Sequence, residues 1–166
     1  MKHFILDALN IIHASKTWSR VLKNDMQASI ALLINAVEGY AVRYPSYRFT
    51  IVVDGAPLRL PGTRPSIIIM NANTPNADQK IKELIRQSHS PSSLTVVSTD
   101  TEVFNYARIN AAHAVTSEEF LKLIAPISIA KASSKNTAPI QEKPAGVSRK
   151  EIERWKREFG DGEELA

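Results

Sequence analysis

The chain has 166 residues, a length that suits one domain with a tail. It contains no cysteine, which excludes disulfide bonds, thiolate zinc sites and cysteine nucleophiles. The formal net charge of +4 permits a nucleic-acid partner without requiring one. Because the sequence shows neither a signal-peptide pattern nor an apolar run of about 20 residues, we expect a cytoplasmic protein that does not enter a membrane.

The first part of the chain predicts a strand, a loop and a long helix. His3–Leu6 is an unbroken apolar run, which is the pattern of a buried parallel strand. We expect a loop from Ala8 to Lys23. Asp25 is a suitable N-cap for a helix from Met26 to about Tyr44, in which apolar residues recur every three or four positions until Pro45.

The middle of the chain predicts two more strands and a second helix. Tyr47–Val53 is rich in β-branched and aromatic residues, and Ser66–Met70 is a short apolar run. A proline-rich loop from Gly55 to Pro65 separates them. Asn76 is suited to cap a helix from Ala77 to about Ser88. We expect the solvated face of this helix to carry its cations, Lys80, Lys82 and Arg86.

The same alternation continues towards residue 124. Strands are predicted at Leu94–Thr99 and around Ala114-Val115, and helices from about Thr101 to Asn110 and from Ser117 to Ile124. Strands that alternate with helices indicate right-handed crossovers and a parallel sheet covered on both faces. The expected fold class is therefore α/β, a Rossmann-like α/β/α arrangement of three layers with a central parallel sheet.

The composition changes after this domain. We assign residues 1–127 to the domain, residues 128–147, rich in alanine, serine, lysine, proline and threonine, to a flexible linker, and residues 148–166 to a C-terminal helix and tail. Ser148 and Glu151 form a capping-box pattern, and Ile152, Trp155 and Phe159 fall on one side of the predicted helix. This helix is expected to cover the domain itself, or to contact a protein partner or a second copy of the chain.

Four aspartates are placed where their side chains can meet. Asp7, Asp54 and Asp100 each follow a predicted strand, and Asp78 opens a predicted helix. Ligands of open α/β sheets bind beyond the carboxyl ends of the strands, so these carboxylates would surround one crevice. A bound cation relieves their repulsion, and carboxylate oxygens are the ligands that Mg²⁺ and Mn²⁺ prefer. The pattern therefore indicates metal-assisted chemistry on phosphate.

Four segments together resemble the NYN domain family, in the YacP-like branch of the PIN-like nucleases. In chain order they are Asp7-Ala8-Leu9-Asn10, Val52-Val53-Asp54-Gly55, Ala77-Asp78 and Ser98-Thr99-Asp100. The resemblance covers Lys2 to about Ile124 and leaves the tail outside. It implies a PIN-like parallel sheet with the first strand at its centre, and metal-dependent endoribonuclease activity with Mg²⁺ or Mn²⁺ as the cofactor.

The resemblance also assigns roles to individual residues. It implies catalytic roles for Asp7, Asn10, Asp78 and Asp100, and metal-binding roles for Asp7, Asp54, Asp78 and Asp100. Asn10 is suited to a hydrogen bond with a ligating carboxylate or with the scissile phosphate. This chain has Ala8 and Leu9 where the family usually has a glycine and an aromatic residue, and Thr101 where an arginine is frequent. These differences concern substrate handling more than metal binding.

Cations near the same edge are candidates for contacts with RNA. Lys16, Arg20 and Lys23 follow the first strand, and Arg59 and Arg64 lie in the proline-rich loop after the second strand. Both segments leave the sheet at its carboxyl end, so these side chains would meet RNA phosphates beside the acids. Trp18 is either a stacking platform for an unpaired base or a packing anchor.

Two functions stay open at this point. One is a metal-dependent endoribonuclease, which acts on free or on ribosome-bound RNA. The other is a catalytically inactive PIN-like module that binds RNA or the ribosome, and binding of Mg²⁺ or Mn²⁺ to the acids distinguishes the two. A phosphatase of the haloacid-dehalogenase type is disfavoured, because that class requires a second aspartate at the position of Leu9.

Overall fold

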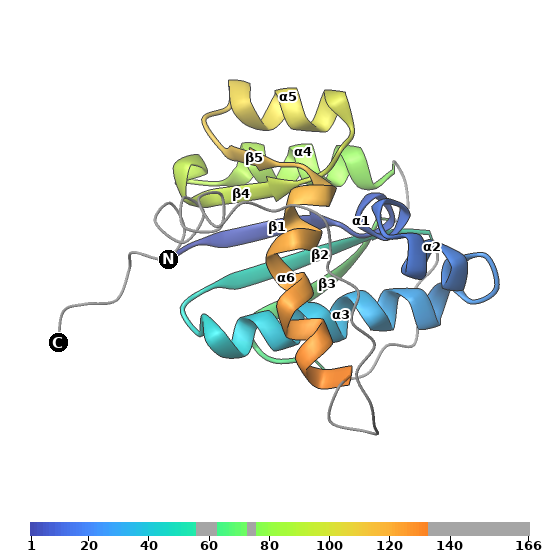
Figure 1. Ribbon diagram of the computed structural model, residues 1–166. Helices are drawn as coiled ribbons and strands as arrows, with labels where there is room; N and C mark the ends of the chain where they lie inside the picture. Colours follow the sequence, from blue (N-terminus) through green and yellow to red (C-terminus); the bar gives the residue numbers. More distant parts are fainter. Residues whose placement is uncertain (56–62, 73–75, 133–166) are drawn as a thin grey trace, which may run out of the picture. The chain divides into compact units, whose positions relative to one another are not determined.

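Within the residues that the computed structural model describes (1–55, 63–72 and 76–132, with side chains as far as Ala125), five parallel strands form a sheet in the order β3-β2-β1-β4-β5 (Figure 1). The strands are β1 (His3–Asp7), β2 (Arg48–Asp54), β3 (Ile67–Ala72), β4 (Leu94–Val97) and β5 (His113–Val115). Each corresponds to a predicted strand, and β1 lies at the centre, as the family resemblance implied.

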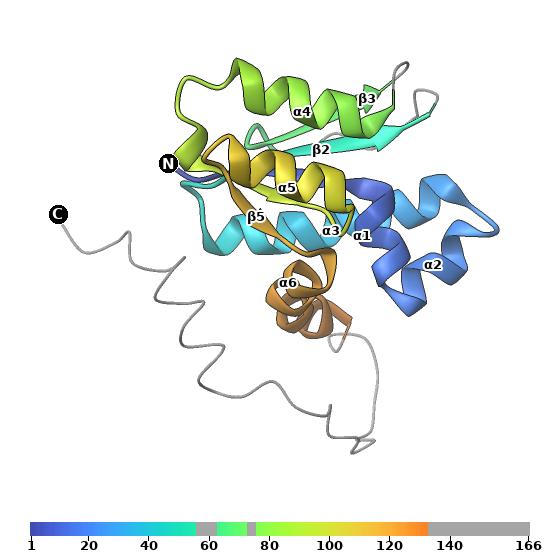
Figure 2. The ribbon, with the colours of Figure 1, turned by 90° about the horizontal axis from the view of Figure 1, so that it is seen from above.

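Helices cover both faces of this sheet. They are α1 (Ala8–Ala14), α2 (Lys16–Leu22), α3 (Met26–Arg43), α4 (Ala77–Gln87), α5 (Thr101–Ile109) and α6 (Ser117–Ala132), with a short 3-10 turn, η1, at Pro91–Ser93. Helices α4 and α5 lie side by side on one face, whereas α1, α3 and α6 lie on the other (Figures 1 and 2). The expected α/β/α arrangement is therefore confirmed.

The loop predicted from Ala8 to Lys23 is wrong, because this segment forms α1 and α2. The Asp7 carboxylate caps α1 by accepting a hydrogen bond from the backbone of Asn10, and the Ser15 hydroxyl caps α2 in the same way. Ile11 and Ile12 of α1 are fully buried. Each helix has only seven residues, which is too short for apolar periodicity to reveal it. The two capping residues were the available signal.

Helix α6 reaches Ala132 and so extends past residue 127, where the domain was expected to end. Residues 133–166, which include most of the predicted linker and the predicted final helix with Ile152, Trp155 and Phe159, lie outside the described residues. Among the helices that are described, none is both long and apolar enough to cross a membrane.

Apolar packing holds α4 and α5 against the sheet. Buried residues from both helices and from the sheet form one cluster, which includes Ile81, Ile85, Val103, Ala107, Ile5, Val52 and Val96. Helix α5 begins shortly after the carboxyl end of β4, and α4 begins shortly after the carboxyl end of β3. The N-terminal turns of α4 and α5 therefore lie at one edge of the sheet, beyond the end of β1.

An aromatic cluster fills the core on the opposite face of the sheet. The ring of Phe4 in β1 stacks on Phe49 of β2, with centroids 5.3 Å apart, and lies 6.1 Å from the ring of Phe120 in α6. All three side chains are buried. Such ring pairs contribute about 0.5–1.5 kcal/mol beyond the area that they bury. The cluster therefore joins the central strand to the helix layer behind it.

We predict that Phe4→Ala lowers the free energy of unfolding by about 3–5 kcal/mol, because it leaves a cavity at the centre of this cluster. Urea unfolding followed by circular dichroism measures the change. The matched control is Ile109→Ala, since Ile109 is 83% exposed and its truncation should change stability by less than about 0.5 kcal/mol. Equal stability of the two variants would contradict the assignment of Phe4 to the core.

Candidate functional site

Three of the predicted acids gather at the carboxyl edge of the sheet. Asp7 ends β1, Asp100 is the N-cap of α5 immediately beyond β4, and Asp78 lies in the first turn of α4. Strands β1 and β4 are neighbours in the sheet, so the first two acids follow adjacent strands. The prediction that these acids lie close together agrees with the effect of the Asp78 and Asp100 charges on the pKa of Asp7.

Asp7 is the most deeply placed of these acids, with an exposed fraction of 5%. The pKa of Asp7 is raised to about 6, mainly by burial, and the charges of Asp78 and Asp100 add to the rise. Two hydrogen bonds act in the other direction and lower this pKa. The carboxylate accepts them from the backbone N–H of Asn10, at 3.2 Å, and from the hydroxyl of Ser98, at 3.1 Å.

Asp78 shares this environment. Burial raises the pKa of Asp78, and among its neighbours Asp100 contributes most to the rise, with smaller contributions from Glu102 and Asp54. The cation Lys82 acts in the opposite direction. Because Coulombic effects weaken with distance, the effects of Asp78 and Asp100 on Asp7 and of Asp100 on Asp78 indicate that these three carboxylates face one region.

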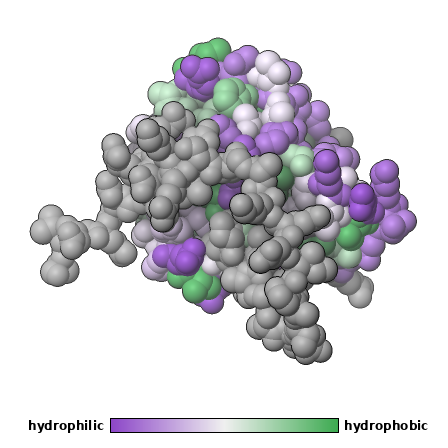
Figure 3. All heavy atoms as spheres, in the orientation of Figure 1, coloured by the Kyte–Doolittle hydropathy of each residue, from purple (hydrophilic) through white to green (hydrophobic). Residues whose placement is uncertain are grey.

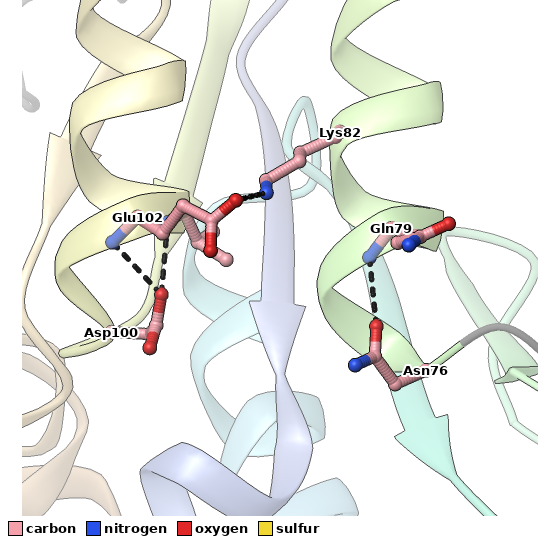
Figure 4. Close-up of polar contacts among 6 residues, drawn as sticks. Asn76, Gln79, Lys82, Asp100 and Glu102 are labelled. Atoms are coloured by element: carbon pink, nitrogen blue, oxygen red, sulfur yellow. Dashed lines mark hydrogen bonds and ion pairs between the residues drawn. The ribbon is translucent and has the colours of Figure 1, made fainter.

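Ser98 connects two of the acids. Its hydroxyl donates to Asp7 and accepts a hydrogen bond from the backbone N–H of Asp100, at 3.1 Å. The Oδ1 atom of Asp100 in turn accepts the backbone N–H groups of Glu102 and Val103, at 2.9 and 3.0 Å (Figure 4). Both capping bonds use Oδ1, so the cap of α5 does not occupy Oδ2.

Asn10 lies beside Asp7, and its catalytic role stays a prediction. Its backbone contacts Asp7, but its side-chain oxygen accepts hydrogen bonds from the backbone N–H of Thr99 and from the hydroxyl of Ser117, both at 2.8 Å. The amide thus links α1 to the segment after β4 and to the start of α6. In this arrangement the Asn10 side chain positions the edge of the sheet around the acids.

Asp54 lies at the end of β2 and is half-buried. The next residue, Gly55, has φ of 109°, a conformation that side chains with a Cβ rarely adopt. This glycine lets the chain turn directly after the acid. The charge of Asp54 contributes least among the carboxylates to the raised pKa of Asp78, which places it at the periphery of the group.

Lys82 was expected on the solvated face of α4, and the structure adds a partner that this expectation did not include. Its ammonium reaches from α4 across to the carboxylate of Glu102 on α5 and forms an ion pair (Figure 4). The charges of Asp78 and Asp100 also contribute to the raised pKa of Lys82, after the hydrogen bond to Glu102. Lys82 lies four residues after Asp78 on α4, and this spacing was the sequence signal that Lys82 would lie beside the acids.

The donor set is of the kind that Mg²⁺ and Mn²⁺ bind, because it consists of carboxylate oxygens. In the described part of the chain, however, no three acidic or histidine side chains are close enough to enclose an ion. The acids therefore fit a divalent ion in chemistry and in general position, but their oxygens do not converge on one point.

Four of the five predicted RNA contacts can be located. Lys16 and Arg20 lie on α2 and Lys23 follows it, so all three share one side of that helix and are exposed. Arg64 is exposed just before β3, and Arg59 lies outside the described residues. Hydrophilic residues gather near α2 at the right-hand edge of Figure 3, with some hydrophobic ones among them. Trp18 is partly buried on α2.

Comparisons with known proteins agree with this architecture. The structure is similar to Rae1 (YacP) from Bacillus subtilis, with a TM-score of 0.66 and 18% identity over 98% of this chain and 86% of that one. A mutant of the same protein gives a TM-score of 0.61 and 19% identity over 81% of this chain and 86% of that one. At these identities the likeness concerns the fold. No curated protein sequence is similar enough to this chain to be matched.

The model of the YacP-like NYN domain matches residues 4–159 of this chain. The match corrects the extent expected from the motifs, which ended at about Ile124, because it includes most of the C-terminal segment. It also spans every acid described above. The chain therefore belongs to the YacP-like NYN domain family, one of the PIN-like nuclease families.

Proposed function

We propose that this protein is a metal-dependent endoribonuclease that hydrolyses phosphodiester bonds of single-stranded RNA at the carboxyl edge of its sheet. Asp7, Asp78 and Asp100 bind Mg²⁺ or Mn²⁺ in this proposal, and Asp54 supports them from the periphery. The observation that carries it is the buried carboxylate of Asp7, whose pKa is raised by burial and by two neighbouring acids. The ionised form of such a carboxylate destabilises the fold, and a bound cation would offset this cost by neutralising the charges.

The residues around the acids suit this chemistry. A bound divalent ion supplies the positive charge that activates a water and stabilises the leaving oxygen. Ser98 and the backbone of Asn10 hold the Asp7 carboxylate in one orientation. Asp100 has its Oδ1 atom fixed by the α5 cap, so its Oδ2 atom is the one available to an ion. The N-terminal turns of α4 and α5 add partial positive charge, which favours a phosphate group at this edge.

One observation favours a second candidate, a catalytically inactive module that binds RNA or the ribosome. It is the absence, among the described side chains, of three acids close enough to enclose an ion. We rank this candidate lower, because a binding module has no need to keep a buried carboxylate beside two others. A nuclease that acts on ribosome-bound RNA retains the same acids and differs only in how its substrate is presented.

We predict that Asp7→Asn and Asp100→Asn each reduce cleavage of labelled single-stranded RNA, in Mg²⁺ or Mn²⁺, by at least about 100-fold, because each removes a metal ligand. Asparagine remains a good N-cap, so Asp100→Asn keeps the start of α5. The matched control is Asp25→Asn, which makes the same change at the exposed cap of α3 and should cleave normally. Undiminished cleavage by both site variants would refute the proposed ligands.

We also predict that Asp7→Asn stabilises the metal-free protein near pH 7.5 by about 2–3 kcal/mol. The pKa of Asp7 rises from 3.8 to about 6 on folding, so the wild type loses stability as pH increases between these values. Asparagine does not ionise, and the Ser98 hydroxyl can accept a hydrogen bond from its amide. Urea unfolding in a chelator should show the two proteins converging near pH 4. A variant that is less stable at neutral pH would contradict this account of Asp7.

A further inference from the structure

A groove between α4 and α5 leads away from the acids and contains none of the residues assigned above to metal binding. Its lining consists of Gln79, Lys82, Glu83 and Arg86 from α4 and Tyr106 from α5. Its volume is about 270 Å³, close to the lower end of the range for small-molecule sites, which suits one nucleobase with its phosphate. Figure 4 shows Lys82, which lines the groove, reaching from α4 towards Glu102 at the start of α5.

The order of side chains along the groove follows from helix geometry. Asp78, Lys82 and Arg86 are each four residues apart on α4, so they follow one another on one face at intervals of about 6 Å along the axis. Glu102 and Tyr106 have the same spacing on α5. A strand of RNA that enters the acid group would therefore meet two cations in succession, with the tyrosine opposite them.

The chemistry of the lining matches recognition of a single strand. The ammonium of Lys82 lies 5.8 Å from the centre of the Tyr106 ring and is paired with Glu102. Arg86 is exposed, and it forms no ion pair within the described ranges of the chain. Glu83, the acid in the lining, is already paired with Lys80, at 3.0 Å. Cations beside an aromatic ring are the combination that binds phosphates and stacks an unpaired base.

We infer that the α4–α5 groove is a nucleotide subsite for the single-stranded RNA next to the scissile phosphate, with Lys82 and Arg86 contacting phosphates and Tyr106 stacking on a base. This inference rests on the proposed function for its substrate. An arriving phosphate competes with Glu102 for the ammonium of Lys82. Movement of Lys82 to that phosphate also uncovers the face of Tyr106 for the base.

The test measures binding separately from cleavage. A fluorescently labelled single-stranded RNA is titrated with the full chain carrying Asp7→Asn, in a chelator, and anisotropy gives the affinity at several salt concentrations. Arg86→Gln and Tyr106→Leu are added to this background. Arg43→Gln is the matched control, because Arg43 is an exposed arginine in the last turn of α3. Tyr106→Phe is the conservative variant, since it keeps the aromatic face and loses only the hydroxyl.

The inference predicts weaker binding for both groove variants. Tyr106→Leu should bind at least about fivefold more weakly, whereas Tyr106→Phe should bind normally. Arg86→Gln should bind more weakly and should lower the slope of log affinity against log salt by about 0.7, which is the loss of one phosphate contact. Arg43→Gln should match the background. Because Tyr106 also packs against the core, the exposed Arg86 keeps the test decisive if Tyr106→Leu folds poorly.

Two opposite results separate this inference from the proposed function. The groove is not a nucleotide subsite if RNA does not bind the background protein. It is also not one if Arg86→Gln leaves the affinity unchanged and Tyr106→Leu binds as tightly as Tyr106→Phe. Cleavage by the otherwise wild-type protein would then still support the nuclease. If binding depends on Arg86 and on the aromatic ring while the wild type cleaves nothing, the subsite stands and the proposed hydrolysis fails.

Discussion

Burial and two neighbouring carboxylates both oppose ionisation of Asp7, which lies at the end of the central strand. The hydroxyl of Ser98 offsets part of that cost, and the same hydroxyl also receives the backbone N–H of Asp100. One serine therefore couples the carboxyl ends of β1 and β4 and sets the start of α5. Asn10 makes the corresponding link from α1 to the start of α6. The edge of the sheet is thus organised around a charge that the fold alone would not favour.

The strand ends and the acids could be predicted from the sequence, because both depend on local patterns. An unbroken apolar run identifies a buried parallel strand, and the residue that follows it must lie at the carboxyl edge. Asp7 and Asp100 were placed by this reasoning alone. The central position of β1 came from the family resemblance, since apolar runs do not reveal the order of strands in a sheet.

Other parts of the site could not be predicted, because they depend on contacts between distant segments. The Asn10 amide joins Thr99 and Ser117, which are separated from it by most of the domain. The ion pair of Lys82 is a second example. Helical periodicity places this residue on the solvated face of α4, but it carries no information about the helix packed beside α4. Only the pairing of α4 with α5 brings its ammonium to Glu102 and to the ring of Tyr106.

The central claim is that the acids bind a divalent ion, and calorimetric titration of Mn²⁺ into the metal-free full chain tests it most directly. The account predicts saturable binding by the wild type and by Asp25→Asn, and loss of that binding in Asp7→Asn and Asp100→Asn. Mn²⁺ should also raise the thermal stability of the wild type and not that of the two site variants. Equal Mn²⁺ binding by all four proteins, or none by the wild type, would contradict the account.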